Sequence, residues 1–191
     1  RMGLGAADLT SINQRLIYCS ISGYGRTGPF AERPGYDAII QAEGGMMGIT
    51  GPVDGPPSRT GVPIIDIASG MFASSAILAA LYERIDSGKG QHIDISLLDS
   101  QIAVLANVAS SFLNSRKPPS RQGNAHPNIA PYEAFHASDK GFMLGAANQR
   151  QWEILCETID QHQLKTDTRF LSNQDRVKNR AELVKVLDGI F

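Results

Sequence analysis

The sequence is organised around one apolar run, Gly61-Val-Pro-Ile-Ile-Asp-Ile-Ala-Ser-Gly70, which stays largely apolar as far as Leu81. Its length and its residue types predict a buried core helix from about Asp66 to Ile85. Residues 15–22 are rich in β-branched and aromatic residues and predict a strand that is covered on both faces. Residues 91–96 alternate between apolar and polar and predict a strand with one face toward solvent. Strands and helices mixed along the chain in this way indicate an α/β fold.

Asp66 is the unusual residue of this run, because isoleucines stand directly before and after it. Burying an unpaired charge is costly, so such a carboxylate must be paired, protonated, used as a helix cap, or kept for chemistry. An Asp that precedes a helix commonly caps it by accepting a hydrogen bond from a free backbone N–H. The run alone leaves open both a helix cap and a reactive carboxylate.

Composition narrows the classes of partner. The chain has 191 residues and a net charge of −1 without a basic block, which argues against nucleic acid and an anionic membrane surface as partners. We expect no membrane span, since Asp66 and several serines interrupt the most apolar stretch. Cys19 and Cys156 lack the spacing of a metal or redox site, so we expect no metal. Two structural thiols in a reducing compartment fit them, and a disulfide between them is the open alternative. The expected location is the cytoplasm, or the mitochondrion in a eukaryote.

The remaining segments predict two domains, at residues 1–115 and 116–191, joined through the polar, proline-rich stretch 114–131. Further helices are expected at 6–13, 36–49, 97–113, 149–159 and 179–190, and a hairpin at 132–135 and 141–146. The loop Gly23–Gly35 follows the first strand and carries Arg26 and Arg33. Ligands of open α/β sheets bind beyond such strand ends, and this loop can offer cations and backbone N–H groups to phosphates.

An ordered set of motifs now gives a resemblance. The set comprises Gly35-Tyr-Asp37, Gln41-Ala-Glu-Gly-Gly45, Ile49-Thr-Gly51, Gly61–Gly70, Gly88-Lys-Gly-Gln-His-Ile-Asp94, Gly123-Asn-Ala-His-Pro127 and Asp175-Arg-Val-Lys-Asn-Arg180. Together these resemble the class III CoA-transferases, the family of formyl-CoA and carnitine CoA-transferases, and among them the succinyl-CoA:glutarate branch. The resemblance covers essentially the whole chain, in order, although complete members are roughly twice as long; we therefore expect a fragment.

The resemblance implies a Rossmann-like large domain followed by a smaller α+β domain, in a homodimer of interlocked chains. It places Asp66 on the catalytic aspartate, which attacks an acyl-CoA thioester, forms an aspartyl mixed anhydride and then an aspartyl-CoA thioester, and passes CoA to a small carboxylic acid. It also assigns CoA contacts to Arg1, Arg33, Gly35 and Tyr36. Coenzyme A is then a substrate, and no permanently bound cofactor is expected.

Two other functions remain open. Acyl-CoA racemases of the same fold carry a histidine where this chain has Tyr36. A tyrosine hydroxyl is a poor proton shuttle near neutral pH, so Tyr36 favours a transferase and is expected to line the CoA or acyl site or to be a buried aromatic residue. A non-catalytic piece that only binds CoA or a partner is the remaining alternative.

Overall fold

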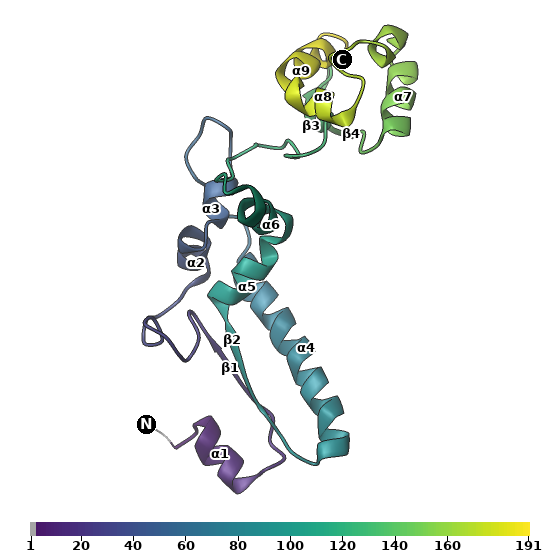
Figure 1. Cartoon of the computed structure of the whole chain (residues 1–191). Coiled ribbons are helices and arrows are strands. Elements are labelled where there is room, and N and C mark those ends of the chain that lie inside the picture. Colours follow the sequence, from purple (N-terminus) through teal and green to yellow (C-terminus); the bar gives the residue numbers. More distant parts are fainter. Residues whose placement is uncertain (1–2) are drawn as a thin grey trace. The chain divides into compact units, whose positions relative to one another are not determined.

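A computed structural model describes residues 3–191 (Figure 1). The elements in chain order are α1 (Ala6–Ile12), β1 (Tyr18–Ser22), α2 (Asp37–Glu43), α3 (Met46–Ile49), α4 (Ile64–Ser87), β2 (His92–Ser96), α5 (Leu97–Val104), α6 (Ala106–Ser115), β3 (Tyr132–His136), β4 (Gly141–Gly145), α7 (Gln149–Thr158), the 3₁₀ helix η1 (His162–Lys165), α8 (Asn173–Lys178) and α9 (Arg180–Asp188). The contacts of the chain define two compact units. Unit 1 comprises residues 3–51 and 55–121, and unit 2 comprises 52–54 and 122–191. The domain boundary at 115/116 stays a prediction.

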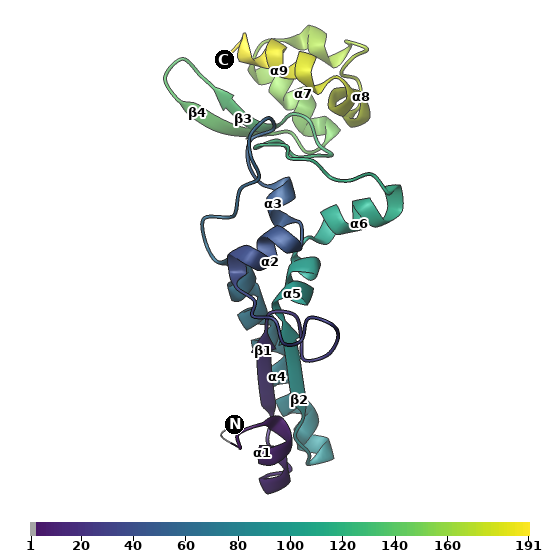
Figure 2. The same cartoon turned by 90° about the vertical axis from the view of Figure 1, so that its left-hand side faces the viewer.

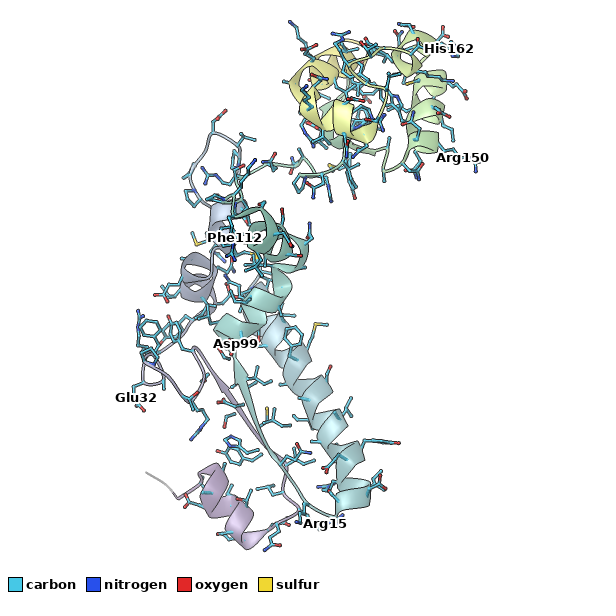
Figure 3. All side chains as sticks on the ribbon, viewed as in Figure 1. Arg15, Glu32, Asp99, Phe112, Arg150 and His162 are labelled. Atoms are coloured by element: carbon cyan, nitrogen blue, oxygen red, sulfur yellow. The ribbon has the colours of Figure 1, made fainter. Side chains whose placement is uncertain are left out.

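Unit 1 is built on two parallel strands, with Ser20 of β1 opposite Asp94 of β2. The long helix α4 runs beside both strands and packs on α5 (Figure 1, Figure 2). At the far end of α4, Arg15 donates a hydrogen bond to the carbonyl oxygen of Gly88 at 3.2 Å (Figure 3). This bond ties the segment before β1 to the end of the helix.

The helix α4 differs from its prediction in start and burial. It begins at Ile64, two residues before Asp66. Of its 24 residues only Ile65, Ser69, Ala73 and Ala80 are buried, so the expected core helix is mostly exposed in this chain. It is also the one helix among residues 3–191 that is long and apolar enough to cross a membrane, with a mean hydropathy of 1.8. Core helices of soluble proteins have the same length and composition, so this helix is weak evidence of a membrane span.

The other predicted segments of unit 1 are shorter than expected. Helix 36–49 is divided at Gly45, whose φ of 90° is left-handed, and helix 97–113 is divided at Ala106, whose φ is 44°. The first strand covers only 18–22, and Ile21 is 53% exposed, so this strand is not covered on both faces. Each segment was right in type. The break at Ala106 was not predicted, and the strand was wrong in its expected coverage.

Unit 2 combines an antiparallel hairpin with helices around a core that includes Phe135, Trp152, Phe170 and Leu183. The hairpin β3–β4 and helices α7 and α9 match the predicted segments. Sequence analysis missed α8, although a capping box marks its start: the Ser172 hydroxyl accepts from the N–H of Asp175, whose carboxylate accepts in return.

Candidate active site

The first turn of α4 is capped by a residue far away in the sequence. Oδ1 of Asp37 accepts hydrogen bonds from the backbone N–H groups of Ile65, at 2.8 Å, and Asp66, at 3.4 Å. The residue at the N-cap position itself is Pro63, whose side chain cannot accept such a bond. Asp37 thus satisfies two of the amides that a helix start leaves without partners.

Asp66 lies in this first turn with its side chain exposed. The prediction that it caps the helix is wrong, because Asp37 holds that role. Within residues 3–191 the carboxylate of Asp66 has no hydrogen-bond or ion-pair partner. The positive end of the helix dipole favours a negative charge at this place. The carboxylate of Asp66 is therefore accessible and has no partner among the described residues.

Gln41 completes the support of the helix start. Its fully buried side chain donates to Oδ2 of Asp37 at 2.6 Å and to the hydroxyl of Thr60 at 3.0 Å, and accepts from the N–H of Thr60 at 2.9 Å. Charge-assisted bonds of this kind fix the Asp37 carboxylate in place. Sequence analysis missed Asp37 and Gln41 as functional residues, although both stand in the quoted motifs.

The backbone before Asp37 passes very close to the end of β1. A Cβ atom added to Gly35 would clash with Cα of Gly23, and one added to Gly23 would lie 2.5 Å from Cα of Gly35. Only glycine fits at either position without a shift of the backbone. This contact returns the Gly23–Gly35 loop to the strand end and directs the chain toward α4.

Tyr36 follows directly, at the start of α2. It is 70% exposed, so the expectation of a buried aromatic residue is wrong. Its carbonyl oxygen accepts the N–H of Ile40 at 2.9 Å. The exposed side chain is accessible to a ligand. Since its neighbour Asp37 bonds the backbone of Asp66, Tyr36 belongs to the same local region as the carboxylate.

Arg33 is half-exposed and already has a partner. Its guanidinium bonds Glu43 at 3.2 Å and lies over the rings of Tyr24, at 5.3 Å, and Phe30, at 4.8 Å. The hydroxyl of Tyr24 donates to the same carboxylate at 2.7 Å, and this bond, followed by burial, raises the pKa of Tyr24 above its ordinary value. A phosphate at Arg33 would compete with Glu43. Arg1 lies outside the described residues.

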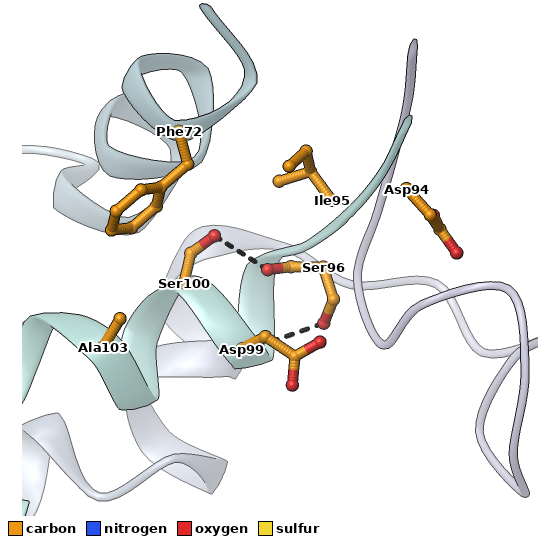
Figure 4. Close-up of a pocket in the computed structure, with 7 residues that line it drawn as sticks. All are labelled: Phe72, Asp94, Ile95, Ser96, Asp99, Ser100 and Ala103. Carbon is orange, nitrogen blue, oxygen red and sulfur yellow. Dashed lines mark hydrogen bonds between the residues drawn. The ribbon is translucent and has the colours of Figure 1, made fainter. Parts of the chain in front are cut away.

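A shallow pocket of about 210 Å³ opens at the carboxyl end of β2 (Figure 4). It is lined by Phe72, Asp94, Ile95, Ser96, Asp99, Ser100 and Ala103. The hydroxyl of Ser96 caps α5 by accepting from the N–H of Asp99 at 3.2 Å. None of the predicted site residues lines this pocket, and its two carboxylates would repel an anionic ligand.

Comparison with known proteins agrees with the motifs. The model of CoA-transferase family III matches residues 1–191. Succinyl-CoA:glutarate CoA-transferase of Mus musculus is 47% identical over 190 residues, which are 100% of this chain and 44% of that protein. Succinate–glutarate CoA-transferase of Agrobacterium fabrum is 44% identical over 98% of this chain and 47% of its own length.

Solved structures show the same fold. The crystal structure of a CAIB/BAIF family protein from Brucella suis matches 98% of this chain and 50% of its own, with 47% identity and a TM-score of 0.80. The chain spans about half the length of the relatives it matches. The predicted α/β fold class is confirmed, and the chain belongs to CoA-transferase family III.

Proposed function

We propose that this chain carries the nucleophile of an enzyme that transfers coenzyme A from an acyl-CoA to a carboxylic acid. One observation carries the proposal: Asp37 caps α4, so Asp66 is left exposed at the helix start without a partner among the described residues. A nucleophilic carboxylate needs this freedom, because a hydrogen-bonded or paired carboxylate must first lose its partner. The family and the transferases similar to this chain support the same chemistry.

The reaction proceeds through covalent intermediates of two kinds, aspartyl anhydrides and an aspartyl-CoA thioester. A carboxylate oxygen of Asp66 attacks the thioester carbonyl, and the C–S bond breaks to give CoA thiolate and an aspartyl mixed anhydride. The thiolate then attacks the aspartyl carbonyl, which releases the first acid and leaves an aspartyl-CoA thioester. The acceptor carboxylate attacks the carbonyl of this thioester, and the C–S bond breaks to give a new anhydride and CoA thiolate. Attack of the thiolate on the acceptor carbonyl frees Asp66 and yields the new acyl-CoA.

The region around Asp66 suits coenzyme A binding. We propose that Arg33 contacts a phosphate, that the exposed ring of Tyr36 packs on the ligand, and that the backbone at Gly35 approaches it closely. Arg1 is included as a CoA contact because the sequence motif assigns it, since it lies outside the described residues. Relatives named for succinyl-CoA and glutarate support dicarboxylic acids as the substrates. An interlocked homodimer and a cytoplasmic or mitochondrial location are part of the same proposal.

Trapping of the covalent intermediate tests the proposal. The full-length protein is incubated with succinyl-CoA and then with hydroxylamine, and peptides are mapped by mass spectrometry. We expect a hydroxamate at Asp66. Asp66→Asn should lower transfer to glutarate by about 10³-fold or more, as expected for loss of a covalent nucleophile.

Asp86→Asn is the matched control, because Asp86 is an exposed aspartate on the same helix. Modification only at other residues, or full transfer activity of Asp66→Asn, would refute the proposal. Exchange of the α-proton of a 2-methylacyl-CoA with deuterium, without transfer of CoA, would instead identify a racemase.

A further inference from the structure

The short segment at residues 58–63 leads directly into α4 and is held by hydrogen bonds at several points (Figure 1). The N–H of Ser58 donates to the carbonyl oxygen of Thr50 at 3.1 Å. The carbonyl oxygen of Val62 accepts from the hydroxyl of Thr60 at 2.7 Å and from the N–H of the first residue of α4 at 2.8 Å. The segment is therefore fixed in place at the start of the helix.

A chain of hydrogen bonds connects this segment to Asp66. The N–H of Thr60 donates to the side-chain oxygen of Gln41 at 2.9 Å. The amide nitrogen of Gln41 donates to Oδ2 of Asp37 at 2.6 Å, and Oδ1 of Asp37 accepts from the N–H of Asp66 at 3.4 Å. Only the two buried side chains of Gln41 and Asp37 thus separate the backbone of Thr60 from the backbone of Asp66.

Arg59 stands directly before Thr60, and its side chain is exposed. Its Nη1 donates to the carbonyl oxygen of Thr60 at 3.2 Å. Among the residues that the structure describes, the guanidinium of Arg59 pairs with no carboxylate. A guanidinium has five N–H donors, so one bond to a carbonyl oxygen leaves most of them available to a ligand. Arg59 is therefore an accessible cation on the segment that is bonded to the turn of Asp66.

Arg33, the cation that the sequence motif assigns to coenzyme A, differs from Arg59 in this respect. Its guanidinium is paired with Glu43 at 3.2 Å and lies over two aromatic rings. An anion that binds Arg33 must compete with the carboxylate of Glu43, whereas no carboxylate of the described chain competes for Arg59. An incoming carboxylate therefore meets a positive charge at Arg59 that the described chain does not neutralise by an ion pair.

We propose that Arg59 binds the second carboxylate of the acid substrate, the one that does not react, and thereby selects dicarboxylic over monocarboxylic acids. The choice of a dicarboxylic acid rests on the proposed function. A guanidinium can bond both oxygens of a carboxylate through two parallel N–H groups, which adds direction to the attraction. With one carboxylate at Asp66 and the other at Arg59, the acid is held at both ends. Thr60 and Gln41 are positioning residues, since they fix the backbone next to Arg59.

Two substitutions separate the charge of Arg59 from its length. Arg59→Lys keeps a positive charge but loses the planar pair of donors, and Arg59→Met keeps an unbranched side chain without the charge. Arg116→Met is the matched control, because Arg116 is another exposed arginine of unit 1. The ligands are glutarate and monomethyl glutarate, which has the same carbon chain but only one free carboxylate. Their dissociation constants are measured by titration calorimetry on the full-length protein.

The unaltered protein should bind glutarate about 10-fold or more tightly than monomethyl glutarate, as expected for a hydrogen bond between charged groups. Arg59→Met should weaken the binding of glutarate by about the same factor and change that of monomethyl glutarate by less than about 2-fold. Arg59→Lys should keep part of the preference for glutarate, because the charge remains. Arg116→Met should leave both affinities unchanged.

Unchanged glutarate affinity in Arg59→Met would overturn the proposal, and so would equal losses for glutarate and its monomethyl ester, which would indicate a structural role. These measurements of binding do not depend on turnover. If Asp66→Asn is inactive and Arg59→Met keeps the preference for glutarate, the proposed function stands and this site does not. If Asp66→Asn retains transfer activity while Arg59→Met loses the preference, the site stands and the proposed nucleophile does not.

Discussion

Oδ1 of Asp37 lies 2.8 Å from the backbone nitrogen of Ile65, across 28 residues of sequence. The same oxygen accepts the N–H of Asp66 at 3.4 Å. Two carboxylates therefore meet at the start of α4 with different roles. One is 9% exposed and caps the helix, and the other is exposed and without a partner in the described chain.

Replacement of Asp37 should loosen the start of α4. Asp37→Ala removes the acceptor for two backbone N–H groups and the partner of Gln41, at a cost of about 1–2 kcal/mol for a lost cap. We expect faster hydrogen exchange at residues 64–67 and a reduced kcat, because Asp66 loses its fixed backbone. Asp86→Ala is the control, and unchanged exchange at 64–67 would contradict the capping role.

Gly35→Ala should destabilise the loop that leads to the site. The added Cβ would clash with Cα of Gly23, so the two backbone segments must separate, at a cost of about 1–3 kcal/mol. We expect a lower melting temperature and weaker binding of CoA. Gly61→Ala is the control, since a Cβ there meets nothing within 4 Å. Equal melting temperatures of the two variants would argue against the close contact.

Substitutions of Arg33 and of its partner Glu43 should change the affinity for CoA in opposite directions. Arg33→Ala removes a cation for phosphate and should weaken CoA binding by about 10-fold. Glu43→Gln removes the competing carboxylate at 3.2 Å and should strengthen binding a few-fold. Calorimetric titration with CoA measures both, with Arg116→Ala as control. Tighter binding in Arg33→Ala would exclude this residue from the CoA site.

The stability that Asp175 contributes should be lost at low pH. Hydrogen bonds from the hydroxyl and the backbone N–H of Ser172 lower the pKa of Asp175 below its ordinary value of 3.8. Its contribution to stability is therefore complete above 3.8 and is lost as the pH falls through the lowered folded-state pKa. The melting temperature of Asp175→Asn should lie below that of the unaltered protein at pH 7, and the gap should close in acid. A gap that widens in acid would contradict this sign.

The two thiols should differ in reactivity. Burial raises the pKa of Cys156 to about 11, so at pH 8 only about one molecule in 10³ carries the thiolate. Cys19 is only half-buried. Labelling with iodoacetamide, followed by peptide mapping, should modify Cys19 well before Cys156 in the native protein. In denaturant the two rates should become similar, and fast native labelling of Cys156 would contradict its burial.

Local sequence patterns were enough to predict most elements of the fold. The hairpin, α7, α9 and the two strands of unit 1 follow from alternation, apolar spacing and turn residues, which act over a few neighbouring positions. A pair of glycines, which are unfavourable inside a helix, stands at the division near Gly45. The division at Ala106 was missed, because a single residue of positive φ changes the helix direction without changing the apolar pattern. The exposure of α4 was also missed, because an apolar sequence does not show whether other parts of the chain cover the helix.

The sequence by itself determined the family, the chemical types at the site and the place of Asp66 within one ordered set of motifs. These depend on residue identity and order alone. Only the tertiary structure decided that Asp37 caps α4 and leaves Asp66 without that role, and that Gly23 and Gly35 touch. The capping bond and the glycine contact join residues that are separated in the sequence and meet only when the chain folds. Composition and periodicity contain no such information.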